Sequence, residues 1–203
     1  MKPKNDARKV FRKLGSCSHT FFFLINRGFG QLHEPEGLAL DTLAGGILKQ
    51  GYQCGMLWGA SMAVGAEAYG RTKDTSKATY MAVEATKDIL DSFKNQTQTY
   101  DCMEITNADF NKKISFFKYM ISGKFLDCFR LSENWAPEAI KTAEESLSKK
   151  YNGIPLENLS CASLVAKKMG ATNEEMQMVA GYAGGLGLSG NACGALSAAV
   201  WMK

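Results

Sequence analysis

The sequence predicts an all-α protein, a helical bundle with an internal repeat whose second copy is partial. Strand patterns are scarce, whereas apolar residues recur at helical spacing in several long segments. One glycine-rich motif also occurs twice along the chain. With 45% hydrophobic and 22% charged residues among 203, the chain has the composition of a folded globular protein rather than a disordered one.

The N-terminal end is basic. Residues 1–13 carry six basic side chains and one acidic side chain, so we expect a short charged arm that frays. The whole chain has a net charge of +4, which leaves the rest nearly neutral and without the basic face that nucleic acids require. The apolar run Phe21–Ile25 is too short for a signal peptide, and we expect a cytoplasmic protein.

Helical periodicity marks the middle of the chain. Apolar residues follow helical spacing over Thr75–Thr97, Phe110–Met120 and Ala136–Leu147, and we expect a helix in each. Pro137 suits the first turn of the last helix, where a backbone N–H has no partner within the helix.

The C-terminal region contains a predicted helix start and a long uncharged segment. Thr172–Glu175 is a capping box that opens a helix over Glu174–Tyr182. Val179–Met202 has 24 residues without a charge, long enough to span a membrane. Because six of them are glycine, we expect a glycine-broken turn followed by a buried helix, and no membrane span.

The repeat aligns without a gap. Gly45–Gly55 and Gly184–Gly194 share the pattern GG(I/L)xxxGxxCG at an offset of 139 residues. We therefore expect a full unit over residues 14–150 and a partial second unit over 151–203. The second unit should pack back on the first in one compact domain, because a partial unit cannot bury its own apolar face. If the chain is a non-catalytic helical protein, this half-unit mimics the partner of a homodimer.

The second copy also matches the dinucleotide-binding pattern GxGxxG over Gly185–Gly190. That pattern needs a strand before it and an acidic residue about 20 positions after it. Here a predicted helix precedes the glycines and the chain ends 13 residues later. We therefore expect no NAD and no other nucleotide.

Each glycine-rich motif ends in a Cys-Gly pair. We expect a helix to begin near Tyr52 or Asn191, which places Cys54 or Cys193 in its first turn. Free N–H groups and the helix dipole favour a thiolate there and lower its pKa. The alternative is a small buried thiol in a tight contact between helices, helped by Gly55.

Four cysteines lie in the first unit, at Cys17, Cys54, Cys102 and Cys128. No CxxC motif occurs, which excludes zinc ribbons, thioredoxin-type motifs and the common ferredoxin spacings. Four dispersed thiols can still converge in a helical bundle, because the cost of closing a loop grows slowly with its length. The chain has only two histidines, too few for a three-histidine zinc site.

The arrangement of these cysteines resembles the C–GCAxxG–C–C family of redox-active proteins. The four family cysteines fall on Cys17, Cys54, Cys102 and Cys128, and the box falls on Cys54–Gly59, where Met56 replaces the alanine. The resemblance implies a [2Fe–2S] cluster held by the four thiols, and electron transfer with a partner redox protein.

In the second copy the family box falls on Cys193–Ala198, where Ala198 replaces the final glycine. Cys161 corresponds to Cys17, but both downstream cysteines are missing. We therefore expect that this copy cannot assemble a four-thiol site alone.

Two other functions stay open. In the first, the protein exchanges thiols and disulfides with Cys54 as the attacking thiolate, because Asp101 and Asp127 would raise the pKa of Cys102 and Cys128. In the second, the chain is a non-catalytic helical protein. The sequence contains no paired carboxylates, Ser-His-Asp set or phosphate-binding loop that would indicate a hydrolase or a transferase. Whether the protein is an enzyme is left open.

Neighbouring residues have two interpretations each. Met56, Trp58 and Phe21–Phe23 either form an apolar shell around a cluster or belong to the plain core. His19, two residues from Cys17, is either an extra ligand or proton carrier, or a structural residue.

Overall fold

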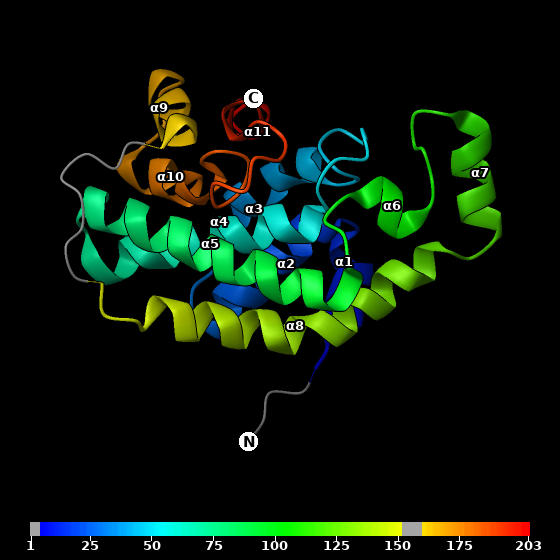
Figure 1. Cartoon of the computed structure of the whole chain (residues 1–203), viewed down its shortest axis with the longest axis horizontal. Helices are drawn as coiled ribbons and strands as arrows, with labels where there is room; N and C mark the ends of the chain where they lie inside the picture. The colour runs from blue at the N-terminus through cyan, green and yellow to red at the C-terminus, as the bar shows by residue number, and fades with distance from the viewer. Residues whose placement is uncertain (1–4, 152–159) are drawn as a thin grey trace.

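The computed structural model describes residues 5–151 and 160–203. Within these ranges the protein is all-α and has no strand, only one isolated bridge between Gln53 and Asp101, so the predicted fold class is confirmed. Figure 1 shows the order of the helices. They are α1 Ala7–Leu14, α2 Cys17–Gly28, α3 Glu34–Ala39, α4 Gly55–Thr72, α5 Thr75–Thr97, α6 Cys102–Thr106, α7 Lys113–Ile121, α8 Phe125–Leu147, α9 Cys161–Lys168, α10 Asn173–Met178 and α11 Gly194–Trp201, with short 3-10 turns at Leu40–Leu43 and Ala180–Tyr182.

Helix α4 lies at the centre and is buried along most of its length, with α2 on one side and α5 on another. Its small residues let the neighbouring backbones approach closely. At Gly59 an added Cβ would lie 1.9 Å from the carbonyl oxygen of Ser18 in α2. The predicted helix Thr75–Thr97 is confirmed as α5, with bounds that agree with the prediction.

Helix α8 is longer than expected and runs along α5 (Figure 1). We predicted that Pro137 lies in a first turn, which is wrong, because Pro137 lies well inside the 23-residue helix. A proline there leaves the carbonyl four residues earlier without its helical donor. The side chain of Asn5 supplies that donor, since its Nδ2 lies 2.6 Å from the carbonyl oxygen of Glu133.

We predicted that residues 1–13 form a frayed arm. This prediction is wrong from Ala7 onward, because helix α1 begins there, and residues 1–4 lie outside the described ranges. Helix α1 buries Ala7, Val10 and Phe11, which are spaced as one helical face, against α8 and α2. The adjoining Asp6 carboxylate accepts two hydrogen bonds from the Arg27 guanidinium, at 2.6 and 3.0 Å. Lys9, Arg12 and Lys13 of this helix are exposed and Arg8 is half-buried, so the charge run did not prevent the apolar face from packing.

The C-terminal segment packs into the same hydrophobic core as the N-terminal helices. Tyr182 is fully buried, its ring meets Trp58 edge to face at 4.8 Å, and its hydroxyl donates to the Trp58 carbonyl. The capping box at Thr172 and Glu175 is confirmed in both directions. The helix it opens ends at Met178, and a 3-10 turn follows. No helix in the described ranges is long and apolar enough to cross a bilayer.

The two glycine-rich segments have matching backbones. Each has six residues with positive φ, at the same positions relative to the motif. The amide of Gly51 donates to the Gly45 carbonyl at 3.0 Å, and that of Gly190 donates to the Gly184 carbonyl at 2.9 Å. The segments also meet, since the Ala192 N–H donates to the side-chain oxygen of Gln53 at 3.1 Å.

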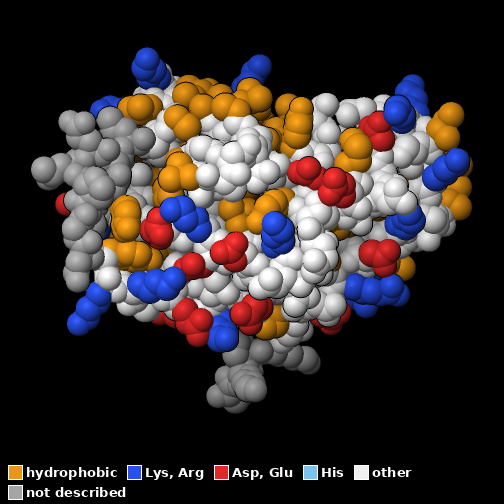
Figure 2. Space-filling model, in the orientation of Figure 1, with side chains coloured by type: hydrophobic (Ala, Val, Ile, Leu, Met, Phe, Trp, Pro, Cys, Tyr) orange, Lys and Arg blue, Asp and Glu red, His pale blue; other side chains and the backbone are white. Residues whose placement is uncertain are grey.

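Helix α7 stands out at one end of the bundle (Figure 1). Figure 2 shows hydrophobic side chains beside lysines at that end of the molecule. Ile114, Phe117 and Ile121 are the most exposed of them, and Tyr119 on the inner side of the helix is buried. The predicted helix over 110–120 is therefore present, shifted by a few residues.

Candidate functional site

A cavity of about 230 Å³ lies at the end of the bundle where α1, α6, α7 and the first turns of α8 come together (Figure 1). All four thiols of the first unit line it, namely those of Cys17, Cys54, Cys102 and Cys128. Cys54 and Cys102 are buried, at 5% and 6% exposure, and the other two are half-buried. The structure thus brings together four cysteines that are widely separated in the sequence.

Each of these cysteines lies at the start of a helix. Cys17 begins α2, Cys102 begins α6 and Cys128 lies in the first turn of α8. Cys54 directly precedes α4, which begins at Gly55 and not near Tyr52, so its predicted place inside the first turn is wrong by one residue. The first N–H groups of a helix have no partner within it, and they favour nearby thiolates.

Cys54 and Cys102 are held side by side by a short pairing of backbone. The Cys54 amide donates to the Tyr100 carbonyl and the Cys102 amide donates to the Tyr52 carbonyl, both at 2.7 Å. The bridge between Gln53 and Asp101 belongs to the same pairing and is reinforced by a hydrogen bond between their side chains at 3.0 Å. This pairing explains how two cysteines 48 positions apart reach one cavity wall.

Gly55 makes room for the Cys17 sulfur. A Cβ built on Gly55 would lie 2.5 Å from the Cys17 Sγ and 3.2 Å from the Cα of Ala44. Any side chain at this position would therefore displace the thiol. This contact explains why a glycine follows Cys54 in the motif: a residue without a side chain leaves the space that the Cys17 sulfur fills.

A hydrogen bond between Cys17 and Cys54 shifts the pKa values of the two thiols in opposite directions. It lowers the pKa of Cys17 to about 7, helped by the backbone N–H groups of Gly45 and Ser18, which together outweigh the effect of burial. The same hydrogen bond, with burial added, raises the pKa of Cys54. The sequence predicted a lowered pKa at Cys54, whereas here the lowered pKa belongs to Cys17 and that of Cys54 is raised; which thiol attacks in a redox reaction stays a prediction.

The other two thiols are poor acids in the absence of a metal. Burial raises the pKa of Cys128 to about 11 and raises that of Cys102 further. Asp101 and Asp127 act in the predicted direction, but burial is the larger cause. The Tyr119 hydroxyl lies 3.3 Å from the Cys128 sulfur, and its hydrogen bond partly offsets this rise.

The apolar shell differs from the predicted one. Met56 lines the cavity as expected, but Trp58 and Phe21–Phe23 do not. Phe21 instead stacks on Trp135 in the core, with ring centroids 4.6 Å apart. Other aromatic rings line the cavity instead, from α1, α7, α8 and the loop before α7. Sequence analysis did not predict them, because they come together only through the placement of these helices. They are Phe11, Phe110, Tyr119, Phe125 and Phe129.

The remaining candidates lie elsewhere. His19 does not line the cysteine cavity, so a role as an extra ligand is not supported. Cys161 begins α9 and Cys193 precedes α11, as Cys17 and Cys54 do for their helices, but both are exposed. Within the described ranges, no three His, Cys, Asp or Glu side chains converge closely enough to hold a single metal ion.

Comparison with known families gives one match. The family described as "Putative redox-active protein (C_GCAxxG_C_C)" matches residues 16–142, more than half of the chain and the segment that contains all four cavity thiols. Comparisons with curated proteins and with solved structures gave no match. The matched segment includes the glycine-rich motif, the helix starts and the cavity described above, and the chain belongs to the C_GCAxxG_C_C family of redox-active proteins.

Proposed function

We propose that this redox-active protein transfers electrons through a [2Fe–2S] cluster held by Cys17, Cys54, Cys102 and Cys128. The supporting observation is that four thiols from four helix starts line one largely apolar cavity. A thiol–disulfide reaction uses two cysteines and gives no reason for the other two. Four thiolates are the usual ligand set of such clusters.

The donor set and the cavity fit the group. A binuclear cluster is held by four thiolates spread over two irons, and all four thiols of this set line one small cavity. When bound, the cluster would take one electron from a donor protein and pass it to an acceptor.

The chain's own residues would tune such a site. Met56 and the aromatic rings exclude water from it, and a low-polarity shell favours the less charged state of the site. The N–H groups near Cys17 and the Tyr119 hydroxyl near Cys128 are directed at sulfur atoms. Hydrogen bonds to ligand sulfurs stabilise the added negative charge and raise the reduction potential.

Matched cysteine variants test the proposal. Cys54→Ser removes a cavity thiol, whereas Cys193→Ser makes the same change at the corresponding position of the second glycine-rich motif, on an exposed residue. After anaerobic purification, Cys54→Ser should lose most of the bound iron and the visible absorption, and Cys193→Ser should keep both. Equal losses in the two variants would contradict the assignment.

A second candidate function rests on the hydrogen-bonded pair Cys17 and Cys54. The Cys17 thiolate would attack a partner's disulfide and release one partner thiolate. Cys54 would then lose its proton and attack the Cys17 sulfur, releasing the second partner thiolate as a Cys17–Cys54 disulfide forms. Two electrons pass to the partner; one of its thiolates takes the Cys54 proton and the other takes a proton from water. The lowered pKa of Cys17 supports this order of attack.

The two candidate functions depend on different cysteines. Cys128→Ser should abolish iron binding if a cluster is held by all four thiols, yet it should leave a Cys17–Cys54 dithiol active. Iron content and the rate of reduction of a small disulfide such as 5,5′-dithiobis(2-nitrobenzoate), measured on the same preparation, separate the two functions.

A further inference from the structure

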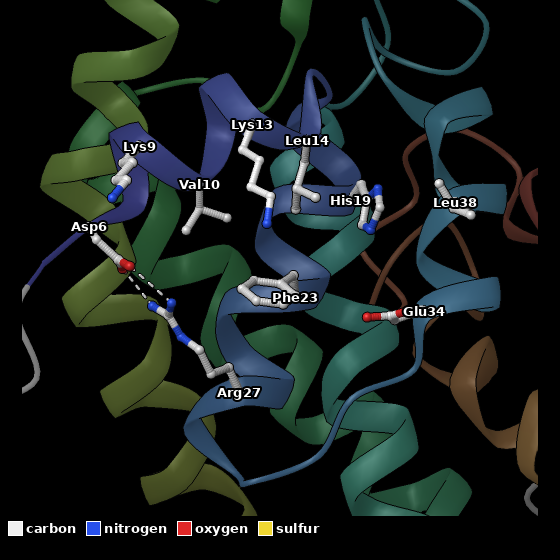
Figure 3. Close-up of a pocket in the computed structure, with 10 residues that line it drawn as sticks. All are labelled: Asp6, Lys9, Val10, Lys13, Leu14, His19, Phe23, Arg27, Glu34 and Leu38. Carbon is white, nitrogen blue, oxygen red and sulfur yellow. Dashed lines mark hydrogen bonds and ion pairs between the residues drawn. The ribbon is translucent and has the colours of Figure 1, made fainter.

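A second cavity, of about 420 Å³, opens beside the cysteine cavity, between α1, α2 and α3 (Figure 3). The same two helices supply residues to both cavities. Phe11 of α1 and Cys17 of α2 line the cysteine cavity. Their neighbours Val10 of α1 and His19 of α2 line the second cavity. The second cavity contains no cysteine, and the redox proposal does not use it.

Its walls suit a small organic molecule. Val10, Leu14, Phe23 and Leu38 give the cavity an apolar lining, and its volume lies in the range of small-molecule sites. Phe23 offers an aromatic face on α2, and Leu38 faces it from α3 across the opening (Figure 3). A flat apolar body of one or two rings fits this space.

The charged groups at the cavity are mostly basic. Arg27 is already paired with Asp6 through two hydrogen bonds, so these two charges neutralise each other. Lys9 and Lys13 follow one another at i and i+4 on α1, and neither has a carboxylate within ion-pair distance in the described part of the chain. Figure 3 shows the Lys13 ammonium group reaching into the cavity. The described lining carries the basic side chains of Lys9, Lys13 and Arg27 against the acidic ones of Asp6 and Glu34, so its charge is positive and favours an anion.

Two buried polar side chains on α2 have atoms without a hydrogen bond in the described part of the chain. His19 is 7% exposed, and its Nδ1 makes no hydrogen bond with any described residue; the Asp41 carboxylate is 3.8 Å away. Asn26, seven residues later on the same face of α2, is 1% exposed, and neither atom of its amide is paired. His19 and Asn26 both line a separate small pocket of about 20 Å³, which shares His19, Phe23 and Glu34 with the cavity. A buried polar group without a hydrogen bond is unfavourable, and a ligand or a bound water that pairs with it removes that cost.

The position of the His19 ring is fixed by α3. A Cβ added to Gly37 would lie 2.7 Å from the His19 Nε2, so the helix packs directly on the ring. Burial lowers the pKa of His19, more than Asp41 and Glu34 raise it. The neutral imidazole can both donate and accept a hydrogen bond.

We infer that this cavity binds a small organic anion with an apolar ring body. Lys9 and Lys13 pair with its anionic group, Phe23 and Leu38 pack on the ring, and His19 binds a polar substituent directly or through one water. The site is independent of the cluster proposal and would persist if that proposal failed.

A pair of fluorescent probes tests the inference on the full-length protein. 8-Anilinonaphthalene-1-sulfonate carries an anionic group on an aromatic body, and N-phenyl-1-naphthylamine is the same body without the charge. We expect the sulfonate to bind one site at least about tenfold more tightly than the neutral probe, since two charge-assisted contacts are added. Lys9→Gln/Lys13→Gln should remove this difference and leave binding of the neutral probe unchanged.

Two matched variants serve as controls. Lys77→Gln/Lys141→Gln removes the same charge from exposed positions on α5 and α8 and should leave both affinities unchanged. Phe117→Ser/Ile121→Ser removes exposed apolar groups from α7, where such probes also adhere, and should leave the tight site intact. If Lys9→Gln/Lys13→Gln bound the sulfonate as the unmodified protein does, or if the α7 variant abolished the tight site, the inference would be overturned. A circular dichroism melt of each variant confirms folding.

Discussion

Replacing Gly55 by alanine should displace the Cys17 thiol. The added methyl carbon would lie 2.5 Å from the Cys17 Sγ and 3.2 Å from the Ala44 Cα. Since non-bonded heavy atoms prefer separations of about 3.5–4.0 Å, the sulfur has to move by about 1 Å. Overpacking of this size typically costs about 1–3 kcal/mol. For a chain of this length that lowers the Tm by about 2–12 °C.

The measurement uses reduced, iron-free protein, so that a change in metal binding does not enter the stability. Thermal unfolding followed by circular dichroism gives the Tm, and the absorbance of thiolate at 240 nm against pH gives the pKa of Cys17. In Gly55→Ala that pKa should rise from about 7 toward its ordinary value, because the displaced sulfur loses the hydrogen bond from Cys54.

Gly70→Ala is the matched control, in the same helix. The atom nearest to its added Cβ is the end of the flexible Gln31 side chain, at 3.2 Å. Its Tm should stay the same or rise slightly, since alanine favours helix over glycine. If Gly55→Ala had the stability of Gly70→Ala and an unchanged pKa at Cys17, the described packing of Gly55 against the thiol would be refuted.

Two further predictions concern stability. The pKa of Cys17, about 7, is lower in the folded protein than in the unfolded chain, so the reduced iron-free protein should be more stable at pH 7.5 than at pH 6, by about 1 kcal/mol. Above about pH 8 the raised pKa values of Cys54, Cys102 and Cys128 oppose this gain. Denaturant titrations at pH 6 and 7.5 measure the gain, and an equal free energy of unfolding at the two values would contradict the lowered pKa. Asn5→Ala should cost about 0.5–1 kcal/mol, because it leaves the Glu133 carbonyl without its donor. In a Pro137→Ala variant the backbone N–H of residue 137 can donate to the Glu133 carbonyl, so Asn5→Ala should then cost little stability. If Asn5→Ala lowered the free energy of unfolding equally with and without Pro137→Ala, the role given to Asn5 would be contradicted.

Local patterns in the sequence predicted much of the fold. Helix α5 and the capping box at Thr172 follow from periodicity and from a short-range motif, and both agree with the structure. Pro137 was misplaced because its tolerance inside α8 depends on a side chain more than 120 residues away in the chain. The N-terminal helix was not predicted because its apolar face consists of only Ala7, Val10 and Phe11 within a segment that is rich in basic residues, and it is stable through its packing on α8 and α2.

The candidate site was predictable in its cysteines but not in its electrostatics. The family pattern identified all four thiols that line the cavity. Which of them has the low pKa depends on the direction of one hydrogen bond, from Cys54 to Cys17, and on amides of the glycine-rich segment. Tyr119 was missed for a related reason: it reaches Cys128 only because α7 folds back over the cavity. No pattern in a single sequence encodes such contacts.

The most direct test of the four-thiol cluster is a count of iron and acid-labile sulfide per chain after anaerobic purification, followed by anaerobic reconstitution with iron and sulfide. We predict about two irons and two sulfides per chain, as a [2Fe–2S] cluster contains, with visible absorption that bleaches on reduction. Protein that remained colourless and free of iron after reconstitution would contradict the proposal.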